Sequence, residues 1–247
     1  LYSLTMPKCE TNANKSTGNI AQALGLEAFK LFKNYRMALF FIFSMLLGCC
    51  LQITNGYAGP FLQSFGINEI YQGTFGVEHS NILISLSQMS ETLCILLIPF
   101  CLSRFGIKKV MLMSMLAWAL RFGFFAIGNP GDGVWLLILS MIVYGIAFDF
   151  FNISGSLFVD KETDISIRNS AQGVFMMITN GLGASLGMLV AGWVMNMYTI
   201  NEGGLMVDKP ETGGWPMAWT VFALYALVVA VVFAIMFKYK HTPESNK

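Results

Sequence analysis

The sequence predicts an all-α membrane protein with six transmembrane helices, and three observations support this fold class. Hydrophobic residues make up 55% of the 247 residues, whereas charged residues make up only 12%. Soluble proteins carry about 25% charged residues, so this composition is typical of a chain that lies in lipid. Six stretches reach the ~20 mostly apolar residues that a membrane-spanning helix needs. Basic residues are concentrated in alternate connections between these stretches.

The six apolar stretches follow one another from residue 37 onwards, and we expect them to form one transmembrane bundle over residues 37–247. They cover about residues 37–62, 80–103, 109–128, 134–158, 169–196 and 216–238. The fifth stretch contains Gly183 and Gly187 at the GxxxG spacing, with Gly192 further on. Small residues at this spacing let a neighbouring backbone approach closely, so we interpret them as a helix-packing surface.

The distribution of lysine and arginine predicts the orientation of the bundle. Most basic residues lie before the first stretch, between the second and third, between the fourth and fifth, and after the last. The opposite connections, over residues 63–79, 129–133 and 197–215, contain one lysine, Lys209. Cytoplasmic loops carry an excess of basic residues, so we expect both termini, including a short C-terminal tail, to be cytoplasmic.

Residues 1–36 precede the bundle, and we expect them to form a cytoplasmic linker. Residues 8–19 are polar, and residues 20–35 are amphipathic. Two interpretations of residues 20–35 stay open: a helix lying on the membrane surface, or an extension of the first span. Because the chain begins with Leu1 and not with methionine, we expect it to be a piece of a longer polypeptide.

Charge and cysteine content argue against several classes of partner. The formal net charge is +1, which gives no basic surface for nucleic acid. The cysteines form no CxxC or Cys/His cluster, so we expect no metal site, no other cofactor, and buried free thiols in the apolar stretches. They are Cys9, Cys49, Cys50, Cys94 and Cys101.

Several polar side chains fall inside the predicted spans, where water is absent. The ionisable ones are Glu91, Arg121 and Asp149. A charge at the bilayer centre costs about 2.5–3.5 kcal/mol, so such residues normally face a bundle interior or an aqueous cavity. Four amides accompany these groups: Gln52, Asn55, Gln88 and Asn152.

The spacing of these groups predicts a small-molecule site shared by the first two spans. Gln52 and Asn55 lie three residues apart on one helix face, and Gln88 and Glu91 repeat this spacing. All four lie in the outer half of the membrane or near its middle, counted at about 1.5 Å per residue. The alternative is interhelical hydrogen bonding, worth about 0.6 kcal/mol per bond. That alternative explains less well a carboxylate together with three amides.

The third and fourth spans add an arginine, two aromatic residues and an acid. Tyr144 and Phe148 share a helix face, and such rings either stack on a planar ligand or pack in the core. Asp149 is rotated about 100° from Phe148, so we expect it to bind a proton or to pair with a basic residue from outside this chain. Arg121 can reach Glu91 or extend outwards, and we interpret it as a structural ion pair or gate.

Five segments of the sequence together resemble the C-terminal half of a major facilitator superfamily transporter. The specific resemblance is to the nucleoside:H+ symporter family of bacterial nucleoside permeases. The segments are QITNGYAGPFL (52–62), SQMSETL (87–93), RFGIKKVM (104–111), LAWALRFG (116–123) and YGIAFDFFNISGS (144–156).

The resemblance implies roles for individual residues. It implies that Gln52, Asn55, Gln88 and Glu91 line the nucleoside site and that the tenth-helix aromatics of the family correspond to Tyr144 and Phe148. The candidate proton-coupling acids are Glu91 and Asp149. A cytoplasmic loop motif keeps its basic part, but it has Pro99 and Ser103 where the superfamily has Gly and Asp. The motif residues that match are Arg104, Gly106, Lys108 and Lys109.

The function implied is proton-coupled nucleoside uptake by alternating access across a bacterial inner membrane. Its partners would be nucleosides, protons, the lipid bilayer and an N-terminal six-helix half, to which residues 1–36 would be the linker. Two alternatives stay open: a sugar or oligosaccharide:H+ symporter of the same superfamily, and a non-transporting structural membrane subunit. An intramembrane enzyme is not expected, because both histidines, His79 and His241, lie outside the spans and the chain has no HExxH motif.

Overall fold

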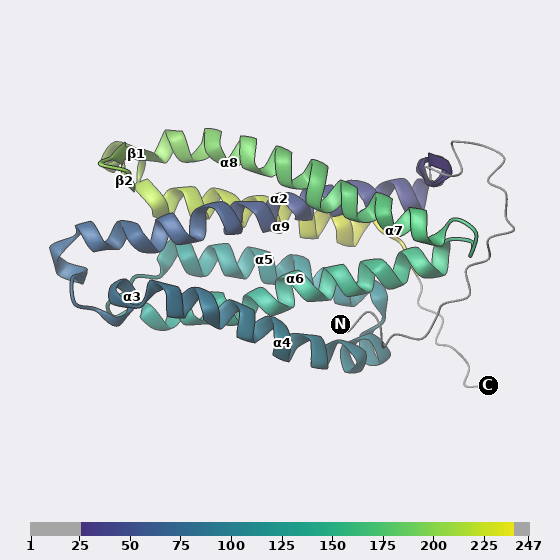
Figure 1. Cartoon of the computed structure of the whole chain (residues 1–247), viewed down its shortest axis with the longest axis horizontal. Helices are drawn as coiled ribbons and strands as arrows, with labels where there is room; N and C mark the ends of the chain where they lie inside the picture. The colour runs from purple at the N-terminus through teal and green to yellow at the C-terminus, as the bar shows by residue number, and fades with distance from the viewer. Residues whose placement is uncertain (1–25, 240–247) are drawn as a thin grey trace, which may run out of the picture.

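The fold consists of six long helices, each long and apolar enough to cross a membrane. The structure is a computed structural model and describes residues 26–239. The six spans are α2 (Tyr35–Ser64), α4 (Ser80–Phe105), α5 (Ile107–Ile127), α6 (Val134–Glu162), the continuous run of α7 (Arg168–Met176), η5 (Met177–Gly183) and α8 (Ala184–Tyr198), and α9 (Gly214–Met236). Each corresponds to one predicted stretch, and its ends differ from the predicted ends by up to four residues. The helices lie side by side along the long axis of the molecule (Figure 1).

The connections gather at the two ends of the bundle. At one end lie α3 (Phe75–Glu78) and the strands β1 (Thr199–Glu202) and β2 (Leu205–Asp208), as Figure 1 shows. The same connections include η3 (Phe65–Ile67), η4 (Glu69–Tyr71) and η6 (Pro210–Thr212). The connections rich in lysine and arginine, between α4 and α5 and between α6 and α7, lie at the opposite end.

The connection over residues 197–215 contains a two-stranded hairpin, which was not predicted. Thr199 pairs with Asp208 and Glu202 with Leu205, which leaves Gly203 and Gly204 as the turn. Both glycines have positive φ, at 61° and 88°, and a two-residue hairpin turn favours this conformation. The Gly-Gly pair was therefore the available signal. The Asp208 Oδ1 atom accepts a hydrogen bond from the backbone N–H of Trp215 at 2.6 Å, which ties the hairpin to the start of α9.

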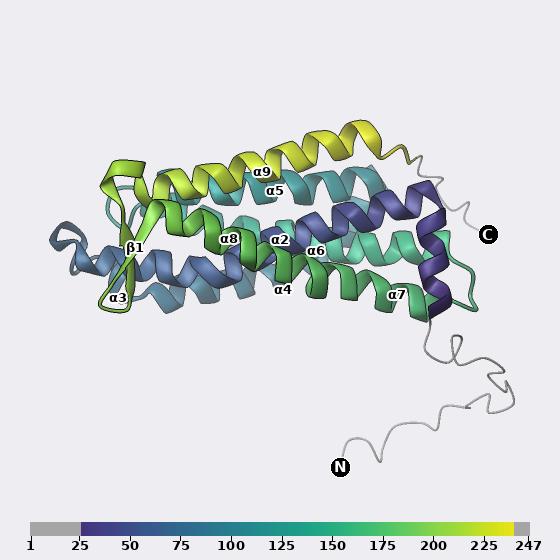
Figure 2. The ribbon, with the colours of Figure 1, turned by 90° about the horizontal axis from the view of Figure 1, so that it is seen from above.

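The segment before the first span forms its own short 3₁₀ helix, η2 (Leu26–Lys33). Asn34 separates it from α2, and the Asn34 side chain caps α2 by accepting a hydrogen bond from the backbone N–H of Arg36 at 3.0 Å. In Figure 2 this purple segment runs across the end of α2. The interpretation of residues 20–35 as a simple extension of the first span is therefore wrong from residue 26 onwards. Residues 1–25 of the predicted linker, and the tail from residue 240, lie outside the described residues.

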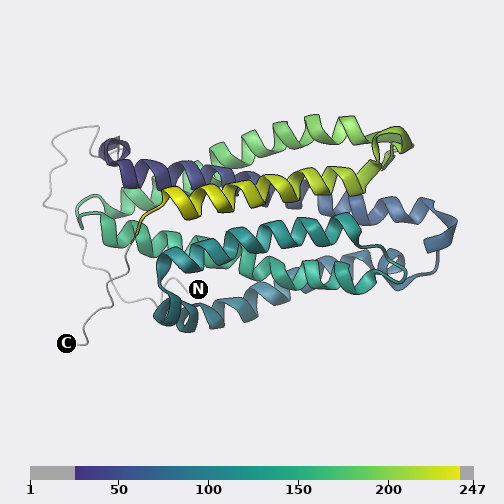
Figure 3. The same ribbon diagram turned by 180° about the vertical axis from the view of Figure 1, so that it is seen from behind.

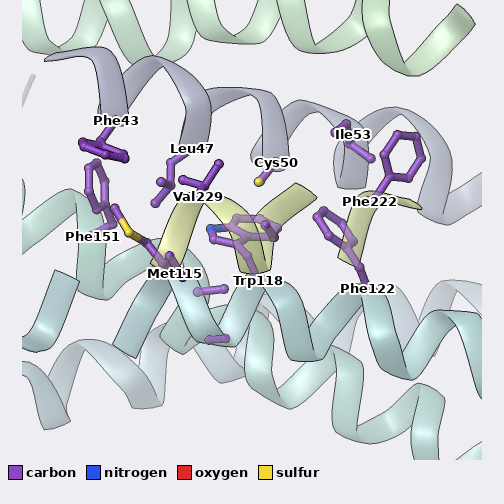
Figure 4. Close-up of a cluster of buried hydrophobic side chains, with 14 of the residues drawn as sticks. Phe43, Leu47, Cys50, Ile53, Met115, Trp118, Phe122, Phe151, Phe222 and Val229 are labelled. Atoms are coloured by element: carbon purple, nitrogen blue, oxygen red, sulfur yellow. The ribbon is translucent and has the colours of Figure 1, made fainter. Parts of the chain in front are cut away.

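The core forms where α2 packs against α5, α6 and α9. Figure 4 shows side chains from these four helices meeting around Trp118, which is 2% exposed. Aromatic packing continues between α5 and α9, which lie side by side in Figure 3. Trp219 of α9 stacks on Phe122 of α5 with ring centroids 5.7 Å apart. The labelled core residues are Phe43, Leu47, Cys50, Ile53, Met115, Trp118, Phe122, Phe151, Phe222 and Val229.

The fifth span packs directly on the backbone of α2, as the GxxxG pair predicted. A Cβ atom on Gly187 would lie 2.5 Å from the Cα atom of Cys49, and one on Gly183 would overlap the backbone of Met45. Conversely, a Cβ atom on Gly48 of α2 would overlap the backbone carbonyl of Thr179. The π-helical turn η5 carries this contact, and the Cys49 thiol donates to the Gly183 carbonyl oxygen at 3.2 Å. We call Gly48, Gly183 and Gly187 the glycine seam.

Replacing Gly187 by alanine tests this seam. Because the new methyl group would meet backbone atoms, which cannot rotate away, we expect Gly187→Ala to lower the free energy of unfolding by about 1–3 kcal/mol. The measurement is the melting temperature in detergent micelles. Gly173→Ala in α7 is the matched control, because a Cβ atom there meets nothing within 4 Å and alanine favours the helix. Equal melting temperatures for the two variants would contradict the seam.

Candidate functional site

The candidate site is a cavity of about 330 Å³ formed by α2, α4, α5 and α6. Ligand pockets have volumes of about 300–1,000 Å³, so this one lies at the lower end of the range. Its lining combines two charged residues, two amides, two hydroxyl residues and a tyrosine with apolar side chains. The lining residues are Thr54, Asn55, Ala58, Gly59, Ile84, Ser87, Gln88, Glu91, Arg121, Met141 and Tyr144.

Close packing of α4 on α6 places the acid beside the tyrosine. A Cβ atom on Gly145 of α6 would lie 2.7 Å from the backbone oxygen of Ser90 in α4. The Ser90 hydroxyl also donates a hydrogen bond to the backbone carbonyl of Ile142. Glu91 follows Ser90, and Tyr144 precedes Gly145, so both side chains enter the same cavity.

Four of the six predicted substrate-binding residues line this cavity: Asn55, Gln88, Glu91 and Tyr144. Asn55 and Gln88 are exposed, and Glu91 is partly exposed, whereas Tyr144 is 8% exposed. The amides therefore lie on a side of the cavity that residues 26–239 leave uncovered, and Tyr144 forms part of its inner wall.

The other two predicted substrate-binding residues, Gln52 and Phe148, do not line the cavity. Phe148 is parallel to Tyr144, with ring centroids 6.0 Å apart and an interplanar angle of 4°. Gln52 is half-buried, three residues before Asn55 on α2. Their roles in binding stay predictions.

Asp149 also lies outside the cavity lining, although it is only 6% exposed. Its Oδ2 atom has no hydrogen-bond partner, and it forms no ion pair with any residue from 26 to 239. Its candidate role in proton coupling stays a prediction.

Arg121 is 2% exposed and is held by neutral groups. Its Nε atom donates to the Thr54 hydroxyl at 3.3 Å, and a terminal nitrogen donates to the Ser140 carbonyl oxygen at 2.6 Å. Its Cζ atom lies 4.4 Å from the ring centroid of Tyr144, and a desolvated cation–π contact contributes about 2 kcal/mol. No ion pair joins it to Glu91 within the described chain, and the guanidinium donors are directed at a hydroxyl and a carbonyl. The role of Arg121 as a structural ion pair or gate stays a prediction.

Six lining residues were not singled out from the sequence: Thr54, Ala58, Gly59, Ile84, Ser87 and Met141. The Ser87 hydroxyl donates to the sulfur atom of Met141 at 3.0 Å, which links α4 to α6 beneath the cavity. Helical spacing was the available signal, because Ser87 lies four residues before Glu91 and Met141 lies three residues before Tyr144. Thr54 directly precedes Asn55.

A larger cavity, of about 650 Å³, lies at the hairpin end of the bundle. Several polar groups in its wall are engaged in local structure. Asp208 accepts from the N–H of Trp215, and Asn129 accepts from the N–H groups of Gly131 and Gly133 at 3.0 and 3.1 Å. We place the candidate site in the smaller cavity, because the predicted residues Asn55, Gln88 and Glu91 line it.

The predicted loop motif forms the turn between α4 and α5. Gly106 has a φ of 76°, a conformation that favours glycine, and it ends α4. The Lys108 ammonium donates to the Ala234 carbonyl oxygen at 3.1 Å, in the last turn of α9, where a positive charge is favourable. Arg104 and Lys109 are exposed. Residues 26–239 contain no group of three His, Cys, Asp or Glu side chains able to hold a metal ion.

Comparison with known proteins points to one family. The family model for the nucleoside H+ symporter matches residues 1–242. The chain is 53% identical to the xanthosine permease of Escherichia coli K12 over 247 residues, which is 100% of this chain and 57% of that protein. It is also 53% identical to the nucleoside permease NupG of the same organism over 242 residues, covering 98% of this chain and 56% of NupG.

Solved structures of NupG are similar in fold. A crystal structure of the nucleoside transporter NupG matches with a TM-score of 0.79 and 52% identity, covering 97% of this chain and 57% of that chain. An aspartate-to-alanine mutant of NupG matches with a TM-score of 0.83 and 51% identity, over 96% and 57% of the two chains.

These comparisons confirm the predicted family and the half-bundle. The chain spans slightly more than half the length of the relatives that it matches. It is a multi-pass membrane chain with the fold of one half of such a permease. On the family match over residues 1–242, the chain belongs to the nucleoside H+ symporter family.

Proposed function

We propose that this chain is the C-terminal half of a proton-coupled nucleoside uptake transporter that works by alternating access. The observation that carries the proposal is the cavity in which Asn55, Gln88, Glu91 and Tyr144 meet at the open side of a six-helix half-bundle. Binding sites near the bilayer midplane, between two repeats that rock against each other, are the common arrangement in such transporters.

The chemistry of the cavity suits a nucleoside. A carboxylate accepts hydrogen bonds, and an amide both donates and accepts, so Glu91, Gln88 and Asn55 together match sugar hydroxyls or base edges. The Tyr144 ring supplies an aromatic surface for a planar base. Phe148, parallel to Tyr144, and Gln52, three residues from Asn55, would extend this site once the other half of the transporter is in place.

The second wall of the site would come from an N-terminal six-helix half, with residues 1–36 as the cytoplasmic linker. Two observations support this partner: the amides Asn55 and Gln88 are exposed within an apolar bundle, and the matched relatives are almost twice as long as this chain. We further propose a bacterial inner membrane with both termini cytoplasmic, which is supported by the basic residues clustered at one end of the bundle.

Proton coupling would use one of two acids, Glu91 in the cavity or Asp149 in the α6 helix. A proton taken up from outside would neutralise the acid while the substrate binds, and its release to the cytoplasm would accompany substrate release.

Substitution of the cavity acid and amide tests the site. In the complete transporter, which comprises this chain and the N-terminal half, we expect Glu91→Ala and Gln88→Ala to reduce radiolabelled uridine uptake at least about tenfold. The reason is that each variant removes a hydrogen-bonding group that water cannot replace in a closed site. Thr92→Val is the matched control, because Thr92 follows Glu91 on α4 but is exposed and bonds only to the Gln88 carbonyl oxygen. Wild-type uptake in both test variants would disprove the site.

The thermal stability of the complete transporter tests the substrate class. We expect uridine and adenosine, but not glucose or lactose, to raise the melting temperature of the complete transporter, because a ligand stabilises the state that binds it. A higher melting temperature with glucose or lactose, but not with the nucleosides, would favour the sugar symporter. A melting temperature that no ligand changes would favour a structural subunit.

A proton ionophore tests the coupling separately. Because accumulation against a gradient needs a second downhill solute, we expect collapse of the proton gradient to abolish uridine accumulation in vesicles, while uridine binding in detergent persists. Accumulation that is unchanged after collapse would disprove proton coupling and leave the binding site unaffected.

A further inference from the structure

We propose that Arg121 is a positioning residue that fixes the ring of Tyr144 in the candidate site and thereby sets the affinity for the planar base of the substrate. The inference rests on the proposed function and deepens it. It gives Arg121 a role that is neither an ion pair with an acid nor a direct hydrogen bond to the ligand.

The guanidinium group is held in place from two neighbouring helices. Thr54 of α2 accepts from its Nε atom, and Ser140 of α6 accepts from a terminal nitrogen through its backbone oxygen. The Ser140 hydroxyl in turn donates to the backbone oxygen of Arg121 at 3.1 Å. This reciprocal pair of bonds fixes both the side chain and its own backbone relative to α6.

The Tyr144 ring is confined by contacts from two helices. The Arg121 Cζ atom lies over it at 4.4 Å, and Trp118, one turn before Arg121 on α5, meets it edge-on with centroids 5.8 Å apart and an interplanar angle of 86°. Phe148 lies parallel to it in α6. Arg121 is the charged member of this set, so it contributes an attraction that depends on its distance and angle to the ring.

The charge arrangement supports positioning over ion pairing. Glu91 lines the same cavity as Arg121 and Tyr144, yet no ion pair of 4.0 Å or less joins Glu91 to Arg121 in the described chain. The guanidinium donors engage neutral acceptors, and the guanidinium lies over the rings of Tyr144 and Phe125, at 4.4 and 5.0 Å from their centroids. Only the planar fork of arginine satisfies two acceptors and stacks on a ring at once, so lysine is a poor replacement.

A double-mutant cycle tests the inference in the complete transporter, with binding of radiolabelled uridine as the readout. We expect Arg121→Lys to weaken binding about tenfold, because the Tyr144 ring loses its fixed orientation. In a Tyr144→Ala background, the same substitution should change binding less than about twofold, because the ring through which Arg121 acts is gone. In a Tyr144→Phe background, which keeps the ring, the tenfold effect should return.

Other outcomes overturn the inference. An equal loss of binding in the wild-type and Tyr144→Ala backgrounds would mean that Arg121 only stabilises the bundle or contacts the ligand itself. If Arg121→Lys does not fold, Thr54→Val replaces it in the cycle, because it removes one acceptor of the guanidinium. Thr54→Val should then weaken uridine binding by less than tenfold in the wild-type and Tyr144→Phe backgrounds and hardly at all in the Tyr144→Ala background. An equal loss of binding in all backgrounds again overturns the inference.

A control separates this inference from the proposed function. Arg168 lies at the start of α7 and does not line the cavity. Arg168→Lys should therefore leave uridine binding unchanged. If the wild-type transporter binds no nucleoside, the proposed function fails. If it binds nucleoside and the cycle is additive, only the role of Arg121 fails.

Discussion

A charged group enclosed among apolar helices has to be solvated by the protein, and Arg121 imposes this requirement on the bundle. Its guanidinium group uses a hydroxyl of α2 and a carbonyl oxygen of α6, and it rests on aromatic rings of α5 and α6. Removal of any partner would leave a buried charge unsatisfied, which is far more costly than the loss of an apolar contact. The positions of α2, α5 and α6 are thus fixed at the level of the cavity, and α4 adds Glu91 to an already ordered wall.

Local sequence signals predicted the features that depend on one helix at a time. The six spans follow from apolar length alone, and the placement of Gln88 and Glu91 on one face follows from their spacing. Features that depend on the rotation of one helix against another were not predictable. The sequence could not reveal that Arg121 engages the Thr54 hydroxyl, or that Gln52 lies outside the cavity lining. The π-helical turn at residues 177–183 also depends on tertiary contact, because it forms where the fifth span meets α2.

Within residues 26–239, the candidate site is one wall and not an enclosure. Its apolar and aromatic side chains are mostly buried, whereas its two amides are exposed. The polar groups that would bind a ligand therefore lie on the uncovered side. This division explains why a half-bundle can have a stable core without a closed pocket: packing is complete behind Tyr144 and Trp118 and incomplete in front of Asn55 and Gln88.

The glycine seam has a mechanical consequence. Side chains at an ordinary helix interface can change rotamer and let two helices slide, but backbone pressed on backbone has no such freedom. In the proposed transport cycle, the part of α2 at the glycine seam and the fifth span would therefore move as one rigid body, and Thr54 and Asn55 would move with them. Bending would then occur outside the seam, at the short linkers and at Pro60 and Pro99, because proline interrupts the hydrogen-bond ladder of a helix.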